Sequence, residues 1–259
     1  MKRDERQSVI MDLLVADGDV DLEQLAARFD VSKMTIHRDL DELEAACLLR
    51  KVRGGATIQS GTQFESDYRF RERRSGNAKA AMADCALDLI EPGMTVMIND
   101  GSMAAVLGAK AGAKRPLTVI TNNAAVIDTL RNEAGITLMA LGGVYSRKFN
   151  AFLGKITEDA LRGLRADIAF ISSPAVAGLE VFHMDDDVVR TKQAMMERAT
   201  TCCLLVHHTR FHQTALHKLA NLSQFDYIIT DQDPEAGALA TLDAAGIALI
   251  IADHRKDAS

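Results

Sequence analysis

The spacing of hydrophobic residues divides the chain into two parts with different periodicities. Up to about residue 57, apolar residues recur every three or four positions in three successive segments, as expected for amphipathic helices. These segments are 9–14, 22–29 and 36–47. Residues 17–19 (Asp-Gly-Asp) supply a stop after the first segment, and Asp21 and Ser32 stand where they can cap the second and third helices.

The third predicted helix is followed by two short runs with β-strand character, 48–52 and 56–58. Gly54 and Gly55 lie between these runs, and this pattern predicts a β-hairpin. Three helices followed by a hairpin are the elements of a winged helix-turn-helix, which we predict for residues 1–58.

Residues 59–76 lose the apolar periodicity and are rich in Gln, Ser, Gly, Asp and Arg, which is typical of a connector. The four arginines at positions 69, 71, 73 and 74 leave two interpretations open. They are either solvated residues of a linker or additional contacts to the phosphates of flanking DNA.

From residue 77 onward, continuous apolar runs alternate with Ala- and Leu-rich helical stretches. The strand-like runs are 95–98, 117–120, 136–141, 168–171, 202–206, 227–229 and 248–251, and the helical stretches are 78–90, 124–130, 188–199 and 235–245. Apolar strands separated by helices are typical of a parallel sheet covered on both faces. We therefore predict an α/β fold in which the winged helix-turn-helix precedes an α/β effector domain, residues 77–259, with a mostly parallel sheet.

Composition limits the classes of protein that fit this organisation. The chain has 259 residues, 47% of them hydrophobic, and a formal net charge of -6, which argues against a nonspecific polyanion binder. No apolar run approaches the length of about 18 residues that a membrane-spanning helix needs, and the N-terminus lacks a signal-peptide pattern, so we expect a cytoplasmic protein without a membrane partner. The four cysteines show no metal-binding spacing, and we expect them to be reduced core residues.

The third predicted helix carries the candidate DNA-reading residues. If Ile36 and Leu40 face the core, the opposite side of its N-terminal half is free to enter a major groove. The predicted DNA contacts are Ser32, Lys33, Thr35, His37 and Arg38 on this helix, and Arg50, Lys51 and Arg53 on the hairpin. Arg38 suits a bidentate contact to guanine and the hairpin cations suit phosphates. An ordinary small helical domain or a protein-interaction domain would show the same pattern.

Loops after the first three strands of the α/β domain are rich in Gly, Ser and Asn. The candidate ligand-binding residues in them are Asn99, Gly101, Ser102, Asn122, Asn123, Gly142 and Gly143. In open α/β sheets, ligands bind at the carboxyl ends of the strands, where backbone NH groups and helix N-termini favour anions. Together the loops indicate a pocket for a phosphate or a polyhydroxy compound, although each loop alone is also an ordinary βα turn.

Residues 3–56 resemble the N-terminal domain of the DeoR family of bacterial regulators. The resemblance rests on LAARF (25–29), VS (31–32), TIHRDL (35–40), LE (43–44) and RGGA (53–56). Two positions depart from the family pattern, since His37 replaces a usual arginine and Cys47 a usual glycine. The resemblance implies double-stranded operator DNA as a partner, bound by a homo-oligomer, and favours repression over activation.

The rest of the chain resembles the effector domain of the same family, whose fold is similar to that of sugar-phosphate isomerases such as ribose-5-phosphate isomerase. The matching residues are GS (101–102), VITN (119–122), LGG (141–143), Gly154, ADIAF (166–170), KQAMM (192–196) and ITD (229–231). The resemblance implies a repressor of a sugar or sugar-alcohol catabolic operon that responds to a small phosphorylated sugar, with Lys192 opposite the phosphate. The departures are Asn99, Met103 and the stretch HHTRF (207–211).

The sequence leaves two other functions open. A sugar-phosphate isomerase needs a carboxylate with an acid–base partner, and Asp100 and residues 185–187 are available, but the DNA-binding part would then have no role. A metal-responsive regulator is suggested by His207, His208, His212 and His217. Adjacent His207 and His208 would point apart on a strand, and no carboxylate completes a set. We therefore expect no catalytic residues, no metal site and no cofactor.

Overall fold

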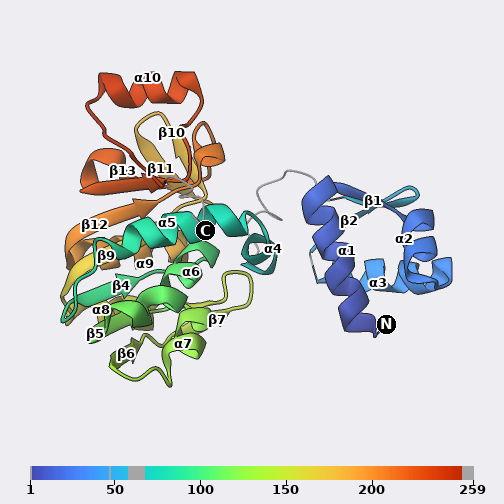
Figure 1. The fold of residues 1–259 in the computed structure, drawn as a ribbon, viewed down its shortest axis with the longest axis horizontal. Helices are drawn as coiled ribbons and strands as arrows, with labels where there is room; N and C mark the ends of the chain where they lie inside the picture. Colours follow the sequence, from blue (N-terminus) through green and yellow to red (C-terminus); the bar gives the residue numbers. More distant parts are fainter. Residues whose placement is uncertain (1, 47, 58–67, 253–259) are drawn as a thin grey trace, which may run out of the picture. The chain divides into compact units, whose positions relative to one another are not determined.

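The computed structural model describes residues 2–46, 48–57 and 68–252, and the chain forms two compact units, Met1–Arg74 and Ser75–Ser259 (Figure 1). Cys47, Ile58 and the first half of the segment predicted to be a connector, residues 59–67, lie outside the described residues. Among the described residues, no helix is long and apolar enough to cross a membrane.

The first unit has the three helices and the hairpin that the periodicity predicted. They are α1 (Arg3–Asp17), α2 (Leu22–Phe29), α3 (Lys33–Ala45), β2 (Arg50–Val52) and β3 (Gly55–Thr57). The caps are also as predicted, because Asp21 accepts hydrogen bonds from the backbone of Glu23 and Gln24, and Ser32 accepts one from the backbone of Thr35.

A short strand, β1 (Asp19–Asp21), was not predicted and extends the hairpin to a three-stranded sheet of order β1-β3-β2. Its residues include part of the predicted stop after the first helix. A Cβ at Gly55 would lie 1.9 Å from the carbonyl oxygen of Val20, so the approach of β1 requires glycine there.

Part of the predicted connector is helical. Helix α4 (Tyr68–Arg73) contacts α1, because the guanidinium of Arg73 donates to the carbonyl oxygen of Ser8 at 2.9 Å and lies 3.3 Å from Asp12. Arg69 donates to the carbonyl oxygen of Ala46 at 3.2 Å. Two of the four arginines therefore hold this helix to the rest of the first unit.

The second unit is built on a seven-stranded sheet in which all neighbouring strands are parallel. The strands, in the order in which they lie side by side, are β15 (Ile250–Ile251), β14 (Tyr227–Thr230), β12 (Ala199–Leu205), β9 (Ala166–Ser172), β4 (Thr95–Ile98), β5 (Leu117–Thr121) and β6 (Ile136–Ala140). Each corresponds to one of the seven predicted strand-like runs, so the α/β prediction is confirmed.

Helices cover both faces of this sheet. The elements beside it are α5 (Gly76–Leu87), α6 (Ser102–Lys110) and α7 (Ala124–Leu130) on one face, and α8 (Lys155–Arg162), α9 (Asp186–Glu197) and α10 (Ala236–Ala244) in the core of the other. Successive residues of a strand alternate between the two cores, so Val96 and Ile98 pack with α5 and α6, while Met97 packs on the opposite face.

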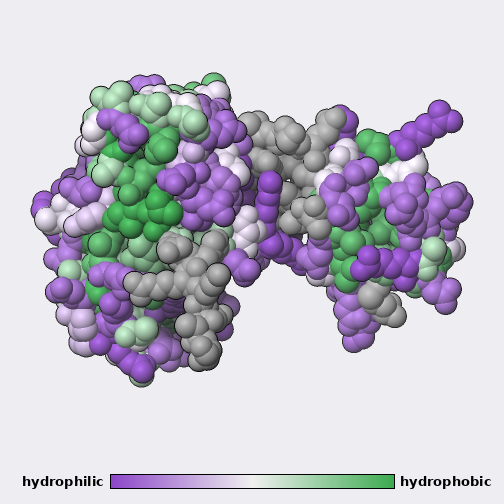
Figure 2. Space-filling view, turned by 45° about the horizontal axis from the view of Figure 1, so that its top comes forward, coloured by the Kyte–Doolittle hydropathy of each residue, from purple (hydrophilic) through white to green (hydrophobic). Residues whose placement is uncertain are grey.

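Smaller elements complete the second unit. They are the antiparallel sheet of β10 (Ala175–Ala177), β11 (Glu180–His183) and β13 (His217–Asn221), the hairpin of β7 (Val144–Ser146) and β8 (Ala151–Leu153), and the 3-10 turns η1 (Ala111–Lys114), η2 (His208–Arg210) and η3 (Leu222–Gln224). Hydrophobic residues also gather in a band on one face of the larger unit (Figure 2).

The order of the strands places a switch point between β4 and β9. From β4 the chain proceeds outward through β5 to β6, and then returns to β9 and proceeds the other way through β12 and β14 to β15. In open α/β sheets, ligands bind at the carboxyl ends of the strands beside such a switch point, and the loops that follow β4 and β9 begin there.

Candidate functional site

The N-terminal half of α3 presents one buried and one exposed side. Ile36 and Leu40 are fully buried in the core of the first unit, while His37 and Arg38 are exposed. Among the residues that the structure describes, His37 and Arg38 have no hydrogen-bond or ion-pair partner. Both side chains are therefore free to contact DNA without breaking an interaction.

The other predicted contacts of α3 are partly engaged within the unit. The exposed Ser32 caps the helix, and its hydroxyl lies 2.9 Å from that of the half-buried Thr35. Lys33 is exposed and forms an ion pair with Glu23 of α2. An ion pair between exposed side chains contributes about 1 kcal/mol or less, so Lys33 can exchange Glu23 for a phosphate at little cost.

The three cations predicted on the hairpin differ in their surroundings. Arg50 and Arg53 are exposed, and neither has a partner within the described ranges 2–46, 48–57 and 68–252. Lys51 is half-buried and pairs with Asp41 of α3, and its backbone NH donates to Glu44 at 2.7 Å. Lys51 thus attaches the hairpin to α3, and Arg50 and Arg53 are the better placed for phosphate contacts.

A buried ion pair that the sequence analysis missed holds α3 against α1. The guanidinium of Arg6 donates to both carboxylate oxygens of Asp39, at 2.5 and 3.1 Å, and the side chains are only 9% and 2% exposed. The hydrogen bond to Asp39 is the main cause that raises the pKa of Arg6 above its usual value. Asp39 lies three residues after Ile36, and this spacing could have placed it on the buried side.

In the second unit, five of the predicted effector residues lie at the carboxyl ends of β4 and β5, namely Asn99, Gly101, Ser102, Asn122 and Asn123. The amide oxygen of Asn99 accepts hydrogen bonds from the backbone NH and hydroxyl of Ser172, which ends β9, at 3.2 and 3.4 Å. Asn123 donates to the carbonyl oxygens of Asn99 and Gly101 and caps α7 through its other amide atom. The side chains of Asn99 and Asn123 therefore join the loops that follow β4, β5 and β9 through hydrogen bonds within the protein.

Lys192 of α9 reaches the same place, although its side chain is only 2% exposed. Its ammonium donates to the carbonyl oxygen of Ser172 at 2.8 Å and lies 3.5 Å from a carboxylate oxygen of Asp100. Asp100 was not among the predicted effector residues, although it stands in the loop that contains three of them, Asn99, Gly101 and Ser102. The charge of Lys192 is thus opposed by a buried carboxylate.

Two buried side-chain acceptors in the described part of the chain lack a hydrogen-bond partner. They are the second carboxylate oxygen of Asp100 and the amide oxygen of Asn122, which follow the neighbouring strands β4 and β5. A buried acceptor without a donor costs about 1–3 kcal/mol, and such atoms in a binding site indicate where a ligand supplies the donor. The hydroxyl groups of a polyhydroxy compound would satisfy both.

The first turn of α6 lacks a side-chain cap, unlike the first turns of α7 and α9. Side chains cap α7 through Asn123 and α9 through Asp185, whereas α6 begins after Gly101 with no side-chain cap. Uncapped backbone NH groups at a helix N-terminus bind phosphate. Gly101 and Ser102 therefore stand at an uncapped helix N-terminus, next to Asp100.

Gly142 and Gly143 lie in the turn before β7, and packing constrains Gly143. The hydroxyl of Thr157 donates to the carbonyl oxygen of Gly142 at 2.7 Å. Gly143 has a φ of +146°, and a Cβ there would lie 2.3 Å from the same hydroxyl oxygen. The close approach of α8 explains this glycine.

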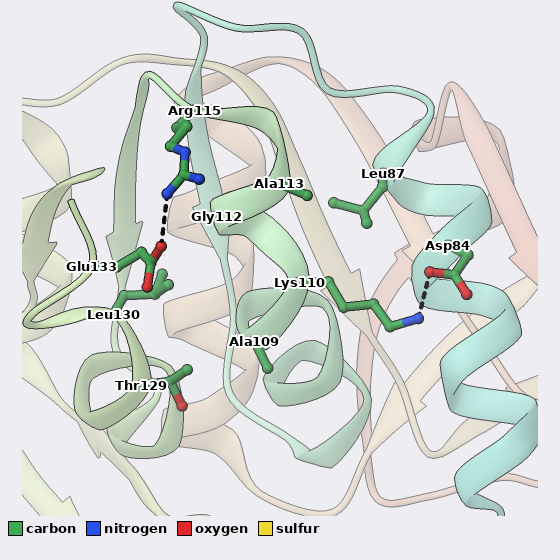
Figure 3. Close-up of a pocket in the computed structure, with 10 residues that line it drawn as sticks. All are labelled: Asp84, Leu87, Ala109, Lys110, Gly112, Ala113, Arg115, Thr129, Leu130 and Glu133. Carbon is green, nitrogen blue, oxygen red and sulfur yellow. Dashed lines mark hydrogen bonds and ion pairs between the residues drawn. The ribbon is translucent and has the colours of Figure 1, made fainter. Parts of the chain in front are cut away.

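A surface cavity of about 490 Å³ between α5, α6 and α7 is a poorer candidate (Figure 3). Its four charged residues are paired among themselves, Lys110 with Asp84 and Arg115 with Glu133. It also lies at the C-terminal end of α6, whereas the candidate effector residues lie at its N-terminal end. A charged ligand in this cavity would therefore have to displace one of these ion pairs.

Comparison with known proteins agrees with the division into two units. Residues 6–62 match the DeoR-like helix-turn-helix domain, and residues 74–232, more than half of the chain, match the DeoR C-terminal sensor domain. Among solved structures, a ribose-5-phosphate isomerase in complex with phospho-erythronic acid is 17% identical, with a TM-score of 0.38 over 51% of this chain and 52% of that chain.

Three curated relatives span nearly the same length as this chain. YgbI of Escherichia coli, named as an HTH-type transcriptional regulator, is 28% identical over 96% of this chain and 98% of its own. The L-fucose operon activator of Haemophilus influenzae is 29% identical over 88% and 91%. The HTH-type transcriptional repressor GlcR of Bacillus subtilis is 28% identical over 99% and 100%. These relatives are regulators and not enzymes, and the chain belongs to the DeoR family of DNA-binding transcriptional regulators.

Proposed function

We propose that this chain is a cytoplasmic repressor of a sugar or sugar-alcohol catabolic operon, released from its operator by a small phosphorylated sugar. The observation that carries the proposal is the pair of unsatisfied acceptors, Asp100 and Asn122, beside the uncapped start of α6. Hydroxyl donors and a phosphate are the two chemical features that this arrangement lacks.

The DNA-binding part of the proposal assigns different tasks to the predicted residues. Arg38 reads guanine, with Thr35 and His37 beside it, and Ser32 and Lys33 contact phosphates at the start of α3. Arg50 and Arg53 contact phosphates from the hairpin, supported by Lys51. Exposure of Arg38 and its lack of a partner in the described residues favour a base contact, because forming that contact breaks no interaction.

The effector part of the proposal separates residues that touch the ligand from residues that shape the pocket. The backbone of Gly101 and Ser102 receives the phosphate, and Asp100 and Asn122 accept hydrogen bonds from hydroxyl groups. Lys192 supplies a positive charge that a phosphate shares with Asp100. Asn99, Asn123, Gly142 and Gly143 hold the loops in place.

The names of the relatives support control of a sugar operon and include both modes of control. One relative is named as an activator of the L-fucose operon, and another is named as a repressor, which is the mode that we propose for this chain. We further propose a homo-oligomer, because repeated operator half-sites require repeated recognition helices and the larger unit shows a hydrophobic band suited to contact between copies (Figure 2). The effector then shifts the population between forms that bind the operator and forms that do not.

A thermal-shift screen of the full chain with sugars and their phosphates tests the effector, and each hit is tested for release of the chain from its own upstream DNA. A phosphorylated sugar should raise the melting temperature more than its unphosphorylated form. Asn122→Ala should weaken binding of the hit about tenfold, since one hydrogen bond is lost. Asn132→Ala, an exposed asparagine of the same unit, should bind it unchanged.

The proposal is wrong if no sugar phosphate stabilises the chain while the chain still binds its upstream DNA. It is equally wrong if a hit stabilises the chain but leaves the footprint on that DNA unaltered.

A further inference from the structure

Two histidines and an aspartate converge at the ends of β12 and β14. His207 and His208 follow β12, and Asp231 follows β14, its parallel neighbour. The expectation that the two imidazoles point apart on a strand was wrong, because β12 ends at Leu205 and the chain turns into η2. The two rings stack with their centroids 4.4 Å apart.

The nitrogen and oxygen atoms of the cluster are spaced like the ligands of a metal ion. One carboxylate oxygen of Asp231 lies 2.8 Å from Nδ1 of His208 and 3.2 Å from Nε2 of His207, and the three atoms lie within 4.8 Å of one another. Bonds of about 2.0–2.1 Å to tetrahedral zinc place neighbouring ligand atoms about 3.3 Å apart. The separation of 3.2 Å is close to this value, that of 2.8 Å is shorter, and the separation between the two imidazole nitrogens is at most 4.8 Å.

Further contacts orient the cluster from behind. The other carboxylate oxygen of Asp231 accepts a hydrogen bond from the backbone NH of His208 at 2.8 Å. Nδ1 of His207 accepts a hydrogen bond from the backbone NH of Thr209 at 3.3 Å and lies 2.9 Å from the hydroxyl of Thr209. When Nε2 binds a metal, Nδ1 carries the proton and donates a hydrogen bond to that hydroxyl instead. Such outer contacts fix the tautomer and the orientation of metal ligands.

The cluster also leaves room for a fourth ligand. Asp231 is 2% exposed, while His207 and His208 are 22% and 28% exposed and line a cavity of about 700 Å³ together with Gln232 and residues 75–78 at the start of α5. Three protein ligands and one open position are typical of metal sites that bind water or a small anion.

We propose that His207, His208 and Asp231 bind one divalent transition-metal ion of the first row, with zinc as the leading candidate. Two imidazoles and one carboxylate favour zinc, nickel or iron over magnesium and calcium, which prefer oxygen ligands. The metal site shares no residue with the proposed effector site, and it stands or falls independently of the sugar phosphate. The carboxylate that the sequence analysis found missing is supplied by Asp231 from a separate strand.

Equilibrium dialysis of the untagged, chelator-treated full chain against zinc chloride, followed by elemental analysis, tests the proposal. We expect one zinc per chain. The double variant His207→Gln, His208→Asn preserves polar groups facing Asp231 but removes both imidazoles, and it should weaken zinc binding by more than about 100-fold, beyond the loss typical of an outer-shell contact. His217→Gln, which removes a histidine outside the cluster, should bind zinc like the parent chain.

A second measurement uses the unaltered chain and avoids any effect of the substitutions on folding. Ring ¹⁵N chemical shifts of the histidines should move on zinc addition at Nε2 of His207 and Nδ1 of His208. Failure of the parent chain to retain zinc, nickel or iron(II) would overturn the proposal and leave a hydrogen-bonded cluster. Stoichiometric binding that the double variant retains, or shifts confined to other histidines, would overturn it as well.

Discussion

Replacing Asp39 with alanine should destabilise the first unit more than any change at its surface. The substitution leaves the guanidinium of Arg6, whose side chain is 9% exposed, without the carboxylate to which it donates two hydrogen bonds. Asp39 was expected only as part of the helix that reads DNA. Its role in the structure is to hold that helix to α1.

The expected loss follows from the burial of the pair. Removing one partner of a buried ion pair costs about 3–5 kcal/mol, because the remaining charge is buried without compensation. Arg6 keeps some contact with solvent, so we expect a loss near the lower limit, about 3 kcal/mol. Since about 1.4 kcal/mol corresponds to a factor of ten, the opening equilibrium of the unit should shift about 150-fold.

Hydrogen exchange of the full chain, followed by mass spectrometry of its peptides, measures this opening in the first unit separately from the second. Amides of α1 and α3 in Asp39→Ala should exchange about 150-fold faster, while those of β4 and β9 should be unchanged. The measurement is needed because the chain contains no tryptophan that could report on either unit.

Glu42→Ala is the matched control, because Glu42 also lies on α3 and pairs with an arginine of α1. That pair, with Arg3, has side chains 49% and 60% exposed, so its loss should cost about 1 kcal/mol or less. Joint replacement, Arg6→Met with Asp39→Leu, should recover most of the lost stability by removing both charges. Equal exchange rates in the Asp39 and Glu42 variants would refute the reasoning.

Three further predictions concern other parts of the chain. Arg38→Ala should weaken operator binding by about 1–3 kcal/mol in a footprinting titration and relax the preference for one base. Arg28→Ala on α2 should change neither, and an unchanged footprint for Arg38→Ala would exclude a contact between Arg38 and a base. Gly143→Ala should lower the free energy of unfolding of the second unit by about 1–3 kcal/mol in a denaturation assay, because its Cβ would lie 2.6 Å from the carbonyl oxygen of Leu153. Gly142→Ala is the control in the same assay, because its Cβ would meet no atom within 4 Å. Burial raises the pKa of Cys202 to about 11 and also raises the pKa of Cys203. Iodoacetamide at pH 8 should therefore leave both thiols unmodified in the native chain, and rapid alkylation of either would contradict their burial.

The sequence by itself was sufficient for elements whose periodicity is local. All seven strands of the parallel sheet were expected from their apolar runs, and the caps at Asp21 and Ser32 from their positions before amphipathic stretches. Helix α6 was not expected, because its residues are apolar nearly throughout and show no polar face. The three-residue strands such as β1 and β7 are too short for any periodicity to be recognised.

The tertiary structure decided which side chains meet. Arg6 and Asp39 are 33 positions apart, and nothing in the spacing within either helix predicts their contact. Lys192 was expected to face a phosphate, yet its ammonium lies beside the carboxylate of Asp100. The two side chains meet because β4 and β9 are neighbours in the sheet, which brings α9 to the end of β4.

The same distinction separates the loops from the sites that they form. Gly101 and Asn122 could be recognised as loop residues after strands, since turn chemistry depends on neighbours in the sequence. That Asp100 and Asn122 keep unsatisfied oxygens, and that Asp231 completes a set with His207 and His208, depends on which strands lie side by side. Hydrophobic periodicity determines the elements, but the order of the strands in the sheet determines the chemistry at its edge.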